Sequence, residues 1–310
     1  MAFHHVSVLR EETIDNLIGN PSGVYVDCTL GGGGHSHALA ERLNDDGLLI
    51  GLDQDADAIA AATKRLEDTT CRHILVQRNF SQLSDVLDEL GIDAVDGVMF
   101  DLGVSSYQLD TPERGFSYMQ DGPLDMRMDR SRGKSAYDVV NSYSEGELYR
   151  IIKEYGEERW AKRIASFIVA ARKEKAIERT GELVSIIKKA IPAGARKDGP
   201  HPAKRTFQAI RIEVNDELGI LRNALESAAN RLKPGGHICV ITFHSLEDRI
   251  TKQTLKVLAT DCICPPDIPV CTCHHKAILK AKRQAISPSP EELEQNPRAR
   301  SAKLRVGIRK

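Results

Sequence analysis

The chain has 310 residues, of which 41% are hydrophobic and 28% charged, and its 43 Lys and Arg against 44 Asp and Glu leave a formal net charge of −1. This composition is typical of a folded globular protein, and the length allows one large α/β domain or two unequal domains. No apolar stretch approaches the roughly 18 residues of a membrane span, and residues 1–5 lack the charged and apolar regions that begin a signal peptide. We therefore expect a cytoplasmic protein.

In chain order, the first third alternates short β-rich runs with helical patterns. The expected strands are residues 24–26, 48–52, 74–76 and 95–100, and the expected helices are residues 38–43, 56–66 and 81–90. Strands that are apolar throughout and separated by helices predict a parallel sheet covered on both faces, which is a doubly wound α/β fold.

The β pattern stops after Asp101. Residues 111–134 are rich in Gly, Pro, Asp and Arg and predict a long loop. Helices are expected at residues 144–155, 157–175 and 180–191, the first with a capping box formed by Ser144 and Glu147.

The sheet pattern resumes towards the C-terminus, with a long helix running to Leu232, a turn at residues 233–236 and a strand at residues 237–243. We therefore predict a Rossmann-like sheet domain in two parts, residues 1–110 and 213–310. An inserted all-helical domain, residues 111–212, separates them.

Charge is distributed unevenly over these parts. Residues 1–125 carry 7 basic and 22 acidic side chains, net −15, whereas residues 159–211 carry 14 and 4, net +10, and residues 276–310 carry 10 and 3, net +7. Clustered Lys and Arg can neutralise phosphates, so the two basic segments are compatible with a nucleic-acid partner. A solvated helix face is the alternative.

A loop with four consecutive glycines, residues 31–34, lies between the first strand and the first helix. Glycine lets a backbone turn sharply and approach a ligand, and the helix start that follows offers free N–H groups. An isolated glycine run can be a mere flexible turn. Ligands of doubly wound sheets bind at the carboxyl ends of the strands, however, and this position favours a binding loop.

Three further candidates follow strands at the same edge of the sheet. Asp53 ends the second strand, 20 residues after Gly33, where a carboxylate can accept both ribose hydroxyls of a nucleoside cofactor; it could instead cap the next helix. Phe80 follows the third strand and fits equally well an adenine contact or a place in the core. Asp101 ends the fourth strand, which lies beside the first in this fold, and is the strongest single candidate.

The cofactor is better matched by S-adenosylmethionine than by a dinucleotide. Ser36 and His37 stand where a dinucleotide fingerprint needs its third glycine, and the chain has no P-loop motif. S-adenosylmethionine contains a nucleoside but no pyrophosphate, so neither departure counts against it.

Seven cysteines, an odd number, favour a reducing compartment over a disulfide scaffold. Four of them form a compact block, Cys262, Cys264, Cys271 and Cys273. C-x-C spacing is less typical of zinc than C-x₂-C. A zinc knuckle and unliganded thiols are both compatible with this block, and we assign no metal ligand from the sequence.

Several ordered blocks resemble the RsmH (MraW) family, bacterial methyltransferases that act on N4 of a cytidine in 16S, small-subunit ribosomal RNA near the decoding centre. The resemblance covers essentially the whole chain. It is carried by residues 33–36 (GGHS), 101–106 (DLGVSS), 114–117 (RGFS), 121–128 (DGPLDMRM), 155–159 (YGEER), 201–203 (HPA), 205–209 (RTFQA), 243–249 (FHSLEDR) and 296–301 (NPRARS).

The resemblance implies a Rossmann-like, class I S-adenosylmethionine-dependent methyltransferase with an inserted helical domain. Cofactor binding is implied at the positions matching Gly33, Gly34, His35, Asp53, Phe80, Asp101 and Gln108. Asp101 is also the expected catalytic residue, although the chain lacks the Pro-Pro pair of the familiar amino-methyltransferase motif. Asp101 as a catalytic residue and Asp101 as a cofactor ligand alone are therefore both open.

The implied partner is 16S ribosomal RNA in the small subunit, as bare RNA or as an assembled particle, and monomer and homodimer are both open. The target base must leave its stack to react, so we expect residues 113–143 and the basic insert to hold the RNA strand. Arg205, Arg211 and Arg249 are the candidates for RNA contact.

Two other functions are compatible with parts of the pattern. A non-catalytic RNA-binding ribosome assembly factor could keep the fold, although the intact Gly33, Gly34, Asp53 and Asp101 argue against a lapsed site. A nicotinamide-dependent oxidoreductase is disfavoured by the missing third glycine and by the basic insert.

Overall fold

The computed structural model describes residues 7–196, 199–265 and 270–310. The chain divides into two compact units: unit 1 is Met1–Gly103 with Leu218–Lys310, and unit 2 is Val104–Glu217. The boundaries expected from the sequence lie after residues 110 and 212. Residues 1–5, used above to argue against a signal peptide, and Lys197 of the basic insert lie outside the described residues. Within the described ranges, every helix is too short or too polar to cross a lipid bilayer.

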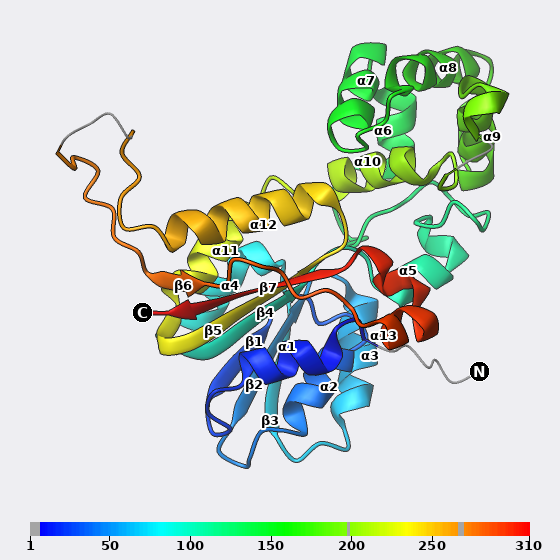
Figure 1. Cartoon of the computed structure of the whole chain (residues 1–310). Helices are drawn as coiled ribbons and strands as arrows, with labels where there is room; N and C mark the ends of the chain where they lie inside the picture. Colours follow the sequence, from blue (N-terminus) through cyan, green and yellow to red (C-terminus); the bar gives the residue numbers. More distant parts are fainter. Residues whose placement is uncertain (1–6, 197–198, 266–269) are drawn as a thin grey trace. The chain divides into compact units, whose positions relative to one another are not determined.

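Unit 1 is a seven-stranded sheet with helices on both faces (Figure 1). Its elements are α1 (Arg10–Leu17), β1 (Val24–Asp27), α2 (Gly34–Ala40), β2 (Leu48–Asp53), α3 (Ala56–Leu66), β3 (Arg72–Gln77), the 3₁₀ turn η1 (Phe80–Gln82), α4 (Leu83–Glu89), β4 (Val95–Asp101), α11 (Leu221–Asn230), β5 (Leu232–Thr242), α12 (Ser245–Leu258), β6 (Leu279–Ala281), α13 (Pro290–Gln295), η4 (Pro297–Ser301) and β7 (Lys303–Arg309). The strand order is β3-β2-β1-β4-β5-β7-β6.

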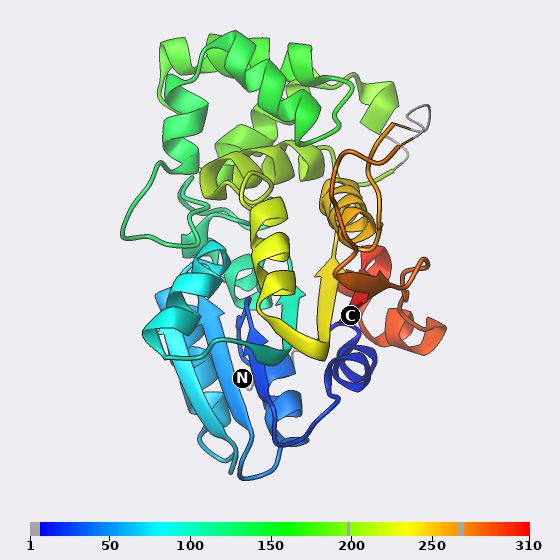
Figure 2. The same cartoon turned by 90° about the vertical axis from the view of Figure 1, so that its left-hand side faces the viewer.

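The four strands expected in the first third are confirmed. They and β5 pair in parallel, side by side (Figure 2), and β4 lies directly beside β1, with Val26 opposite Val98. Their carboxyl ends therefore share one edge of the sheet, because parallel strands point the same way. The helix expected at residues 38–43 is α2, which begins at Gly34, immediately after the glycine loop. Helix α1, before the first strand, was not predicted.

Alternate residues of each strand supply two separate cores. Val26, Val98 and Val240 point towards α4, α11 and α12, whereas Tyr25 and Met99 point towards α1 and α2 on the other face. Burial of one such side chain contributes roughly 1.5–3 kcal/mol. The sheet is thus covered on both faces, and polar side chains at its carboxyl edge are held by a rigid support.

The C-terminal part differs from the expectation in three ways. The sheet is mixed, because β7 runs antiparallel between β5 and β6. Strand β5 was expected, whereas β6 and β7 were not predicted. The long helix expected up to Leu232 is two helices, interrupted at Asp216, whose φ of 50° is left-handed. The turn expected at residues 233–236 is included in the long strand β5, at a bulge opposite β4.

Unit 2 is all-helical, as expected. It contains α5 (Ser106–Asp110), η2 (Pro112–Arg114), α6 (Ala136–Ser142), α7 (Glu145–Glu154), α8 (Ala161–Glu174), α9 (Thr180–Ala190), η3 (Ala193–Arg196) and α10 (Lys204–Asn215). The capping box of Ser144 and Glu147 is confirmed. Helix α8 begins at Ala161 rather than 157, since Glu157 has a left-handed φ of 48°. Helix α6 was not predicted.

Candidate active site

The glycine loop turns directly from β1 into α2. Gly33 is the residue before the helix and has φ of 74°, and a Cβ there would lie 3.1 Å from the Cβ of Ala62. Only glycine adopts this conformation without strain and without that close contact. The loop is closed by the Gly33 N–H, which donates to the Leu30 carbonyl over 2.8 Å. The backbone is therefore a built turn and not a merely flexible linker.

Asp53 lies against this loop at the end of β2. Its carboxylate accepts N–H bonds from Gly31 at 2.8 Å and from Asp55 at 2.9 Å. Asp55, and not Asp53, caps α3, by accepting from the Asp57 N–H. Burial raises the pKa of Asp53 to about 6, against the lowering effect of the two N–H donors. Asp53 therefore ties the second strand to the glycine loop and is free of the helix-capping role considered above.

Asp27 and Asp101 bring two more carboxyl groups to the same edge. Asp27 is fully buried at the end of β1, where Ser36 Oγ donates to it over 2.7 Å and the Thr29 N–H over 3.1 Å. Burial raises its pKa to about 6. The Asp101 N–H donates to Thr29 Oγ1 at 2.5 Å, which holds the end of β4 beside β1.

Asp101 has the most perturbed carboxyl group of the three. Burial, followed by the negative charges of Asp27 and Glu247, raises its pKa well above the usual value. Its Oδ1 is buried and has no hydrogen-bond partner among the described residues, while the side chain keeps 27% of its surface exposed. A buried acceptor without a donor is costly in a folded protein and marks a place for a ligand donor.

His35 lies 3.5 Å from Asp101, measured from Nδ1 to Oδ2. Its Nε2 is 3.0 Å from the Val8 carbonyl, and Nε2 must be the donor because a carbonyl only accepts. Nδ1 of His35 therefore faces the carboxyl group of Asp101, whose Oδ1 is the unpartnered oxygen.

Glu247 completes the cluster and was missed by the sequence reasoning. It is 2% exposed at the start of α12, accepts from the N–H of Phe243 at 2.8 Å, and lies 3.0 Å from Nε2 of His244. Asp27 was noted only as the first residue of the loop. Both signals were in the sequence, since an acidic residue follows each of β1 and β5, the two strands that flank β4.

Phe80 packs edge-to-face on Phe100, with ring centroids 5.9 Å apart, and is half-buried against the core of the α4 face. This contact accounts for one side of its ring. The adenine contact expected of Phe80 stays a prediction.

Gln108 belongs to unit 2. It forms a capping box with Ser105 at the start of α5: the Gln108 N–H donates to Ser105 Oγ at 3.2 Å, and the Ser105 N–H donates to Gln108 Oε1 at 3.1 Å. These bonds account for its burial. Its implied role in cofactor binding also stays a prediction.

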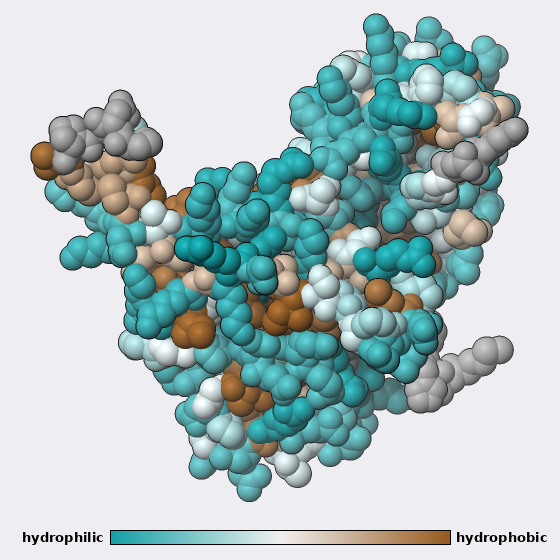
Figure 3. All heavy atoms as spheres, viewed as in Figure 1, coloured by the Kyte–Doolittle hydropathy of each residue, from teal (hydrophilic) through white to brown (hydrophobic). Residues whose placement is uncertain are grey.

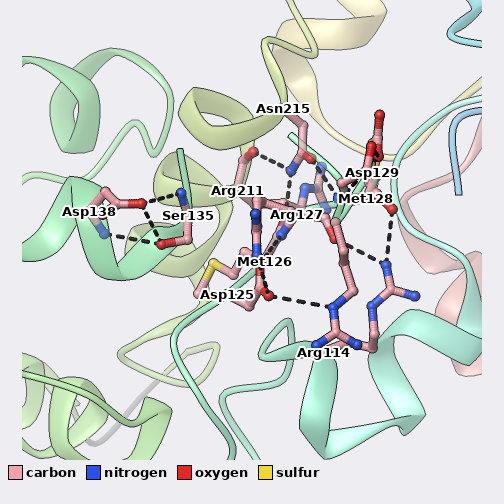
Figure 4. A network of polar contacts seen from close by, with 12 residues as sticks. Arg114, Asp125, Met126, Arg127, Met128, Asp129, Ser135, Asp138, Arg211 and Asn215 are labelled. Carbon is pink, nitrogen blue, oxygen red and sulfur yellow. Dashed lines mark hydrogen bonds and ion pairs between the residues drawn. The ribbon is translucent and has the colours of Figure 1, made fainter. Parts of the chain in front are cut away.

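The long loop predicted after α5 is irregular but firmly held (Figure 4). Arg114 is 2% exposed, and its guanidinium donates to the carbonyls of Arg127 at 3.0 Å and Met128 at 3.1 Å. Asn215 of α10 receives the Met128 N–H at 2.8 Å and donates to the Met126 carbonyl at 2.8 Å. The loop is thereby fixed to the helices of its own unit.

The candidates for RNA contact have different surroundings. Arg211 makes a two-pronged ion pair with Glu217, at 2.8 and 2.9 Å, with side-chain exposures of 15% and 10%. That pair engages two nitrogens of the guanidinium, and the RNA contact expected of Arg211 stays a prediction. Arg205 is exposed on α10, with one bond to the Glu157 carbonyl, and Arg249 is exposed on α12 of unit 1.

Comparison with known proteins matches residues 2–310 to the MraW methylase family. A ribosomal RNA small subunit methyltransferase H from Clostridioides difficile is 59% identical over 99% of both chains. The protein of the same name from Symbiobacterium thermophilum is 56% identical over all of this chain and 98% of its own. A solved rRNA methylase from Streptococcus thermophilus aligns with 97% of this chain and 93% of its own, at 10% identity and a TM-score of 0.42.

Proposed function

The chain belongs to the MraW methylase family, and on that premise we propose that it transfers the methyl group of S-adenosyl-L-methionine to N4 of a cytidine in 16S ribosomal RNA of the small subunit, near the decoding centre. Two relatives that match almost end to end carry the name of a small-subunit rRNA methyltransferase. The single observation in the fold that supports the activity is the buried, unpartnered Oδ1 of Asp101 at the carboxyl edge of the sheet. A ribosomal substrate also agrees with the cytoplasmic location expected above.

The residues at this edge suit a cofactor that is both a nucleoside and a cation. Asp53 presents a carboxylate whose backbone bonds leave further lone pairs for ribose hydroxyls. Asp27, Asp101 and Glu247 place three buried acids near one another, and Coulombic repulsion among them raises the pKa of Asp101 further. A sulfonium would relieve that repulsion, since a nearby positive charge favours ionised carboxyl groups.

Asp101 has the properties that the amine requires. When bound, the cofactor supplies an electrophilic methyl group. The exocyclic amine of cytosine is a weak nucleophile because its lone pair is delocalised into the ring. Asp101 Oδ1 can accept a hydrogen bond from N4 and so orient the lone pair, and the Asp101–His35 pair can take up the proton that the amine loses.

Unit 2 is proposed to hold the RNA. Its fixed loop and the exposed Arg205 combine an ordered surface with positive charge. Residues 159–211 carry net +10, and RNA affinity depends strongly on neutralised phosphates. Arg205 is the better candidate of the two α10 arginines, because two nitrogens of Arg211 are already paired with Glu217.

The test is transfer of labelled methyl groups to purified small subunits and to bare 16S RNA, with wild type, Asp101→Asn and a matched control. Asp93→Asn is the control, because Asp93 is exposed near the opposite end of β4. We expect Asp101→Asn to lower the rate at saturating cofactor by roughly a hundredfold or more, and Asp93→Asn to leave it unchanged. The label should map to N4 of a cytidine.

Two outcomes would contradict the proposal. Label outside 16S RNA, or no transfer with either substrate despite cofactor binding, would favour a binding or assembly factor. If excess cofactor restores the Asp101→Asn rate, Asp101 serves only in cofactor binding and its catalytic role is wrong.

A further inference from the structure

Four cysteines of unit 1 bring their sulfur atoms together between α12 and β6. The Sγ atoms of Cys262, Cys264, Cys271 and Cys273 all lie within 4.8 Å of one another. The separations from Cys271 are 3.5 Å to Cys262, 3.5 Å to Cys273 and 4.0 Å to Cys264, and Cys262 and Cys273 are 3.9 Å apart. All four residues are described, although residues 266–269 between them are not.

These separations fit one metal ion. Four thiolates at the zinc–sulfur bond length of about 2.3 Å form a tetrahedron whose edges are about 3.8 Å long. A disulfide would instead need two sulfurs at about 2.0 Å. Near-equal separations, with no pair much shorter than the rest, indicate a single centre. We propose that Cys262, Cys264, Cys271 and Cys273 bind one structural zinc ion through four thiolates, each thiol giving its proton to solvent.

The backbone around the cluster suits thiolates. The Thr272 N–H donates to Cys264 Sγ over 3.4 Å, and Thr272 Oγ1 lies 3.9 Å from the same sulfur. Donors that point at the ligand sulfur are typical of the second layer of contacts around a bound metal. The thiol set has no carboxylate or imidazole in it, and soft ligands of this kind select zinc, copper(I) or iron.

The described part of the segment that carries the cysteines has no apolar core to stabilise it. Among residues 261–265 and 270–276 none is buried, and Ile263 and Val270 are 51% and 70% exposed. The segment extends away from the sheet in Figure 1, and its surface is tan to brown beside teal neighbours in Figure 3. Short segments without a core are usually held by a metal or by disulfides.

Among the described residues of the segment, those at its base are tied by hydrogen bonds to the rest of unit 1. The Ile278 N–H donates to the Leu258 carbonyl at 2.9 Å, and His275 Nδ1 bonds to the Thr260 carbonyl at 2.8 Å. Further along the described segment, the two cysteine pairs are brought together at their sulfur atoms. A metal centre therefore explains why four thiols outside the core converge, where free thiols would be open to oxidation.

The experiment is metal analysis of the full chain, produced without a metal-affinity tag in medium containing both zinc and iron. We expect one zinc per chain in wild type and less than half of that in Cys262→Ser and Cys273→Ser. Cys71→Ser, which changes a buried thiol elsewhere in unit 1, should keep its zinc. His274→Ala should also keep it, which tests the four-thiol set against a histidine ligand beside it.

Circular dichroism of each variant separates loss of the site from loss of the fold. Zinc lost from a variant with a wild-type spectrum and unit 1 intact supports the proposal. If both serine variants fail to fold, cobalt(II) added to the metal-stripped wild type decides: intense visible bands of tetrahedral tetrathiolate cobalt support the site, and their absence overturns it. Purified wild type with disulfides, with iron in place of zinc, or with zinc that survives in both serine variants, would also overturn it.

Discussion

The pH dependence of stability measures how strongly burial of the ionised Asp27 carboxylate destabilises the carboxyl edge of the sheet. Burial raises its pKa from 3.8 to about 6. One pKa unit corresponds to 1.36 kcal/mol, so the ionised carboxylate destabilises the folded state by about 3 kcal/mol. The sign follows from the raised pKa. Below pH 3.8 Asp27 is protonated in the folded and in the unfolded state, and the folded state has its full stability. This contribution to the free energy of unfolding is lost as the pH rises through about 6.

Asp27→Asn removes the titration while keeping the shape of the side chain and an acceptor for the Thr29 N–H. The free energy of unfolding of the cofactor-free wild type should fall as the pH rises, relative to the variant. The full difference is about 3 kcal/mol, and about half of it should develop between pH 5 and 7.5. Removing the Asp27 charge also removes its repulsion of the Asp101 carboxylate. This second effect further increases the stability of the variant over wild type at high pH.

The assay is urea unfolding followed by far-ultraviolet circular dichroism at several pH values in that range. Fluorescence of Trp160, the single tryptophan, follows unit 2 separately. The control is Asp45→Asn, which changes an exposed carboxylate in the turn before β2. Its free energy of unfolding should depend on pH as that of wild type does. If Asp27→Asn also parallels wild type at every pH, the argument that burial destabilises the ionised group is refuted.

Three further outcomes are expected. Asp53→Ala should raise the Kd for S-adenosylmethionine at least roughly tenfold in calorimetry, because hydrogen bonds to a charged group contribute about 1.5–3 kcal/mol; an unchanged Kd would exclude the ribose contact. In wild type the same Kd should rise as the pH falls below about 6, where Asp53 takes up a proton and loses acceptor capacity; a Kd that stays flat down to pH 5 would contradict this. Gly115→Ala should destabilise unit 2 by about 2 kcal/mol or more in urea unfolding followed by Trp160 fluorescence, because φ is 72° and the new Cβ would lie 2.1 Å from the Pro123 carbonyl oxygen; wild-type stability would show that the loop relaxes.

The strands β1 to β5 could be predicted, and the candidate site residues named, because both depend on local signals. A single short stretch of sequence is enough to recognise an apolar strand, the glycine loop or an acid at a strand end. Asp53 and Asp101 were chosen in this way. Their raised pKa values were not predicted, because burial arises only when the strands and helices meet. For Asp101, the repulsion from Asp27 and Glu247 also requires that β1, β4 and α12 come together.

The errors have local causes too. The break after α10 depends on the left-handed Asp216, a conformation that the helical periodicity of the segment does not reveal. Strand β7 alternates apolar and polar residues and was overlooked within a segment judged by its charge. The ion pair of Arg211 with Glu217 was not foreseen either, because it depends on where α10 ends.

The order of the strands also constrains how the chain can fold as it is synthesised. β4 ends at Asp101 and β5 begins at Leu232, so all of unit 2 emerges from the ribosome before the sheet can continue. β7, the last seven-residue strand of the chain, inserts between β5 and β6. Pairings this distant in sequence form late, since a long loop must close first. The half-sheet of β1 to β4 must therefore wait, with the β4 edge unpaired, until β5 has been made. Translation of unit 2 is thus the period in which a chaperone would be most useful.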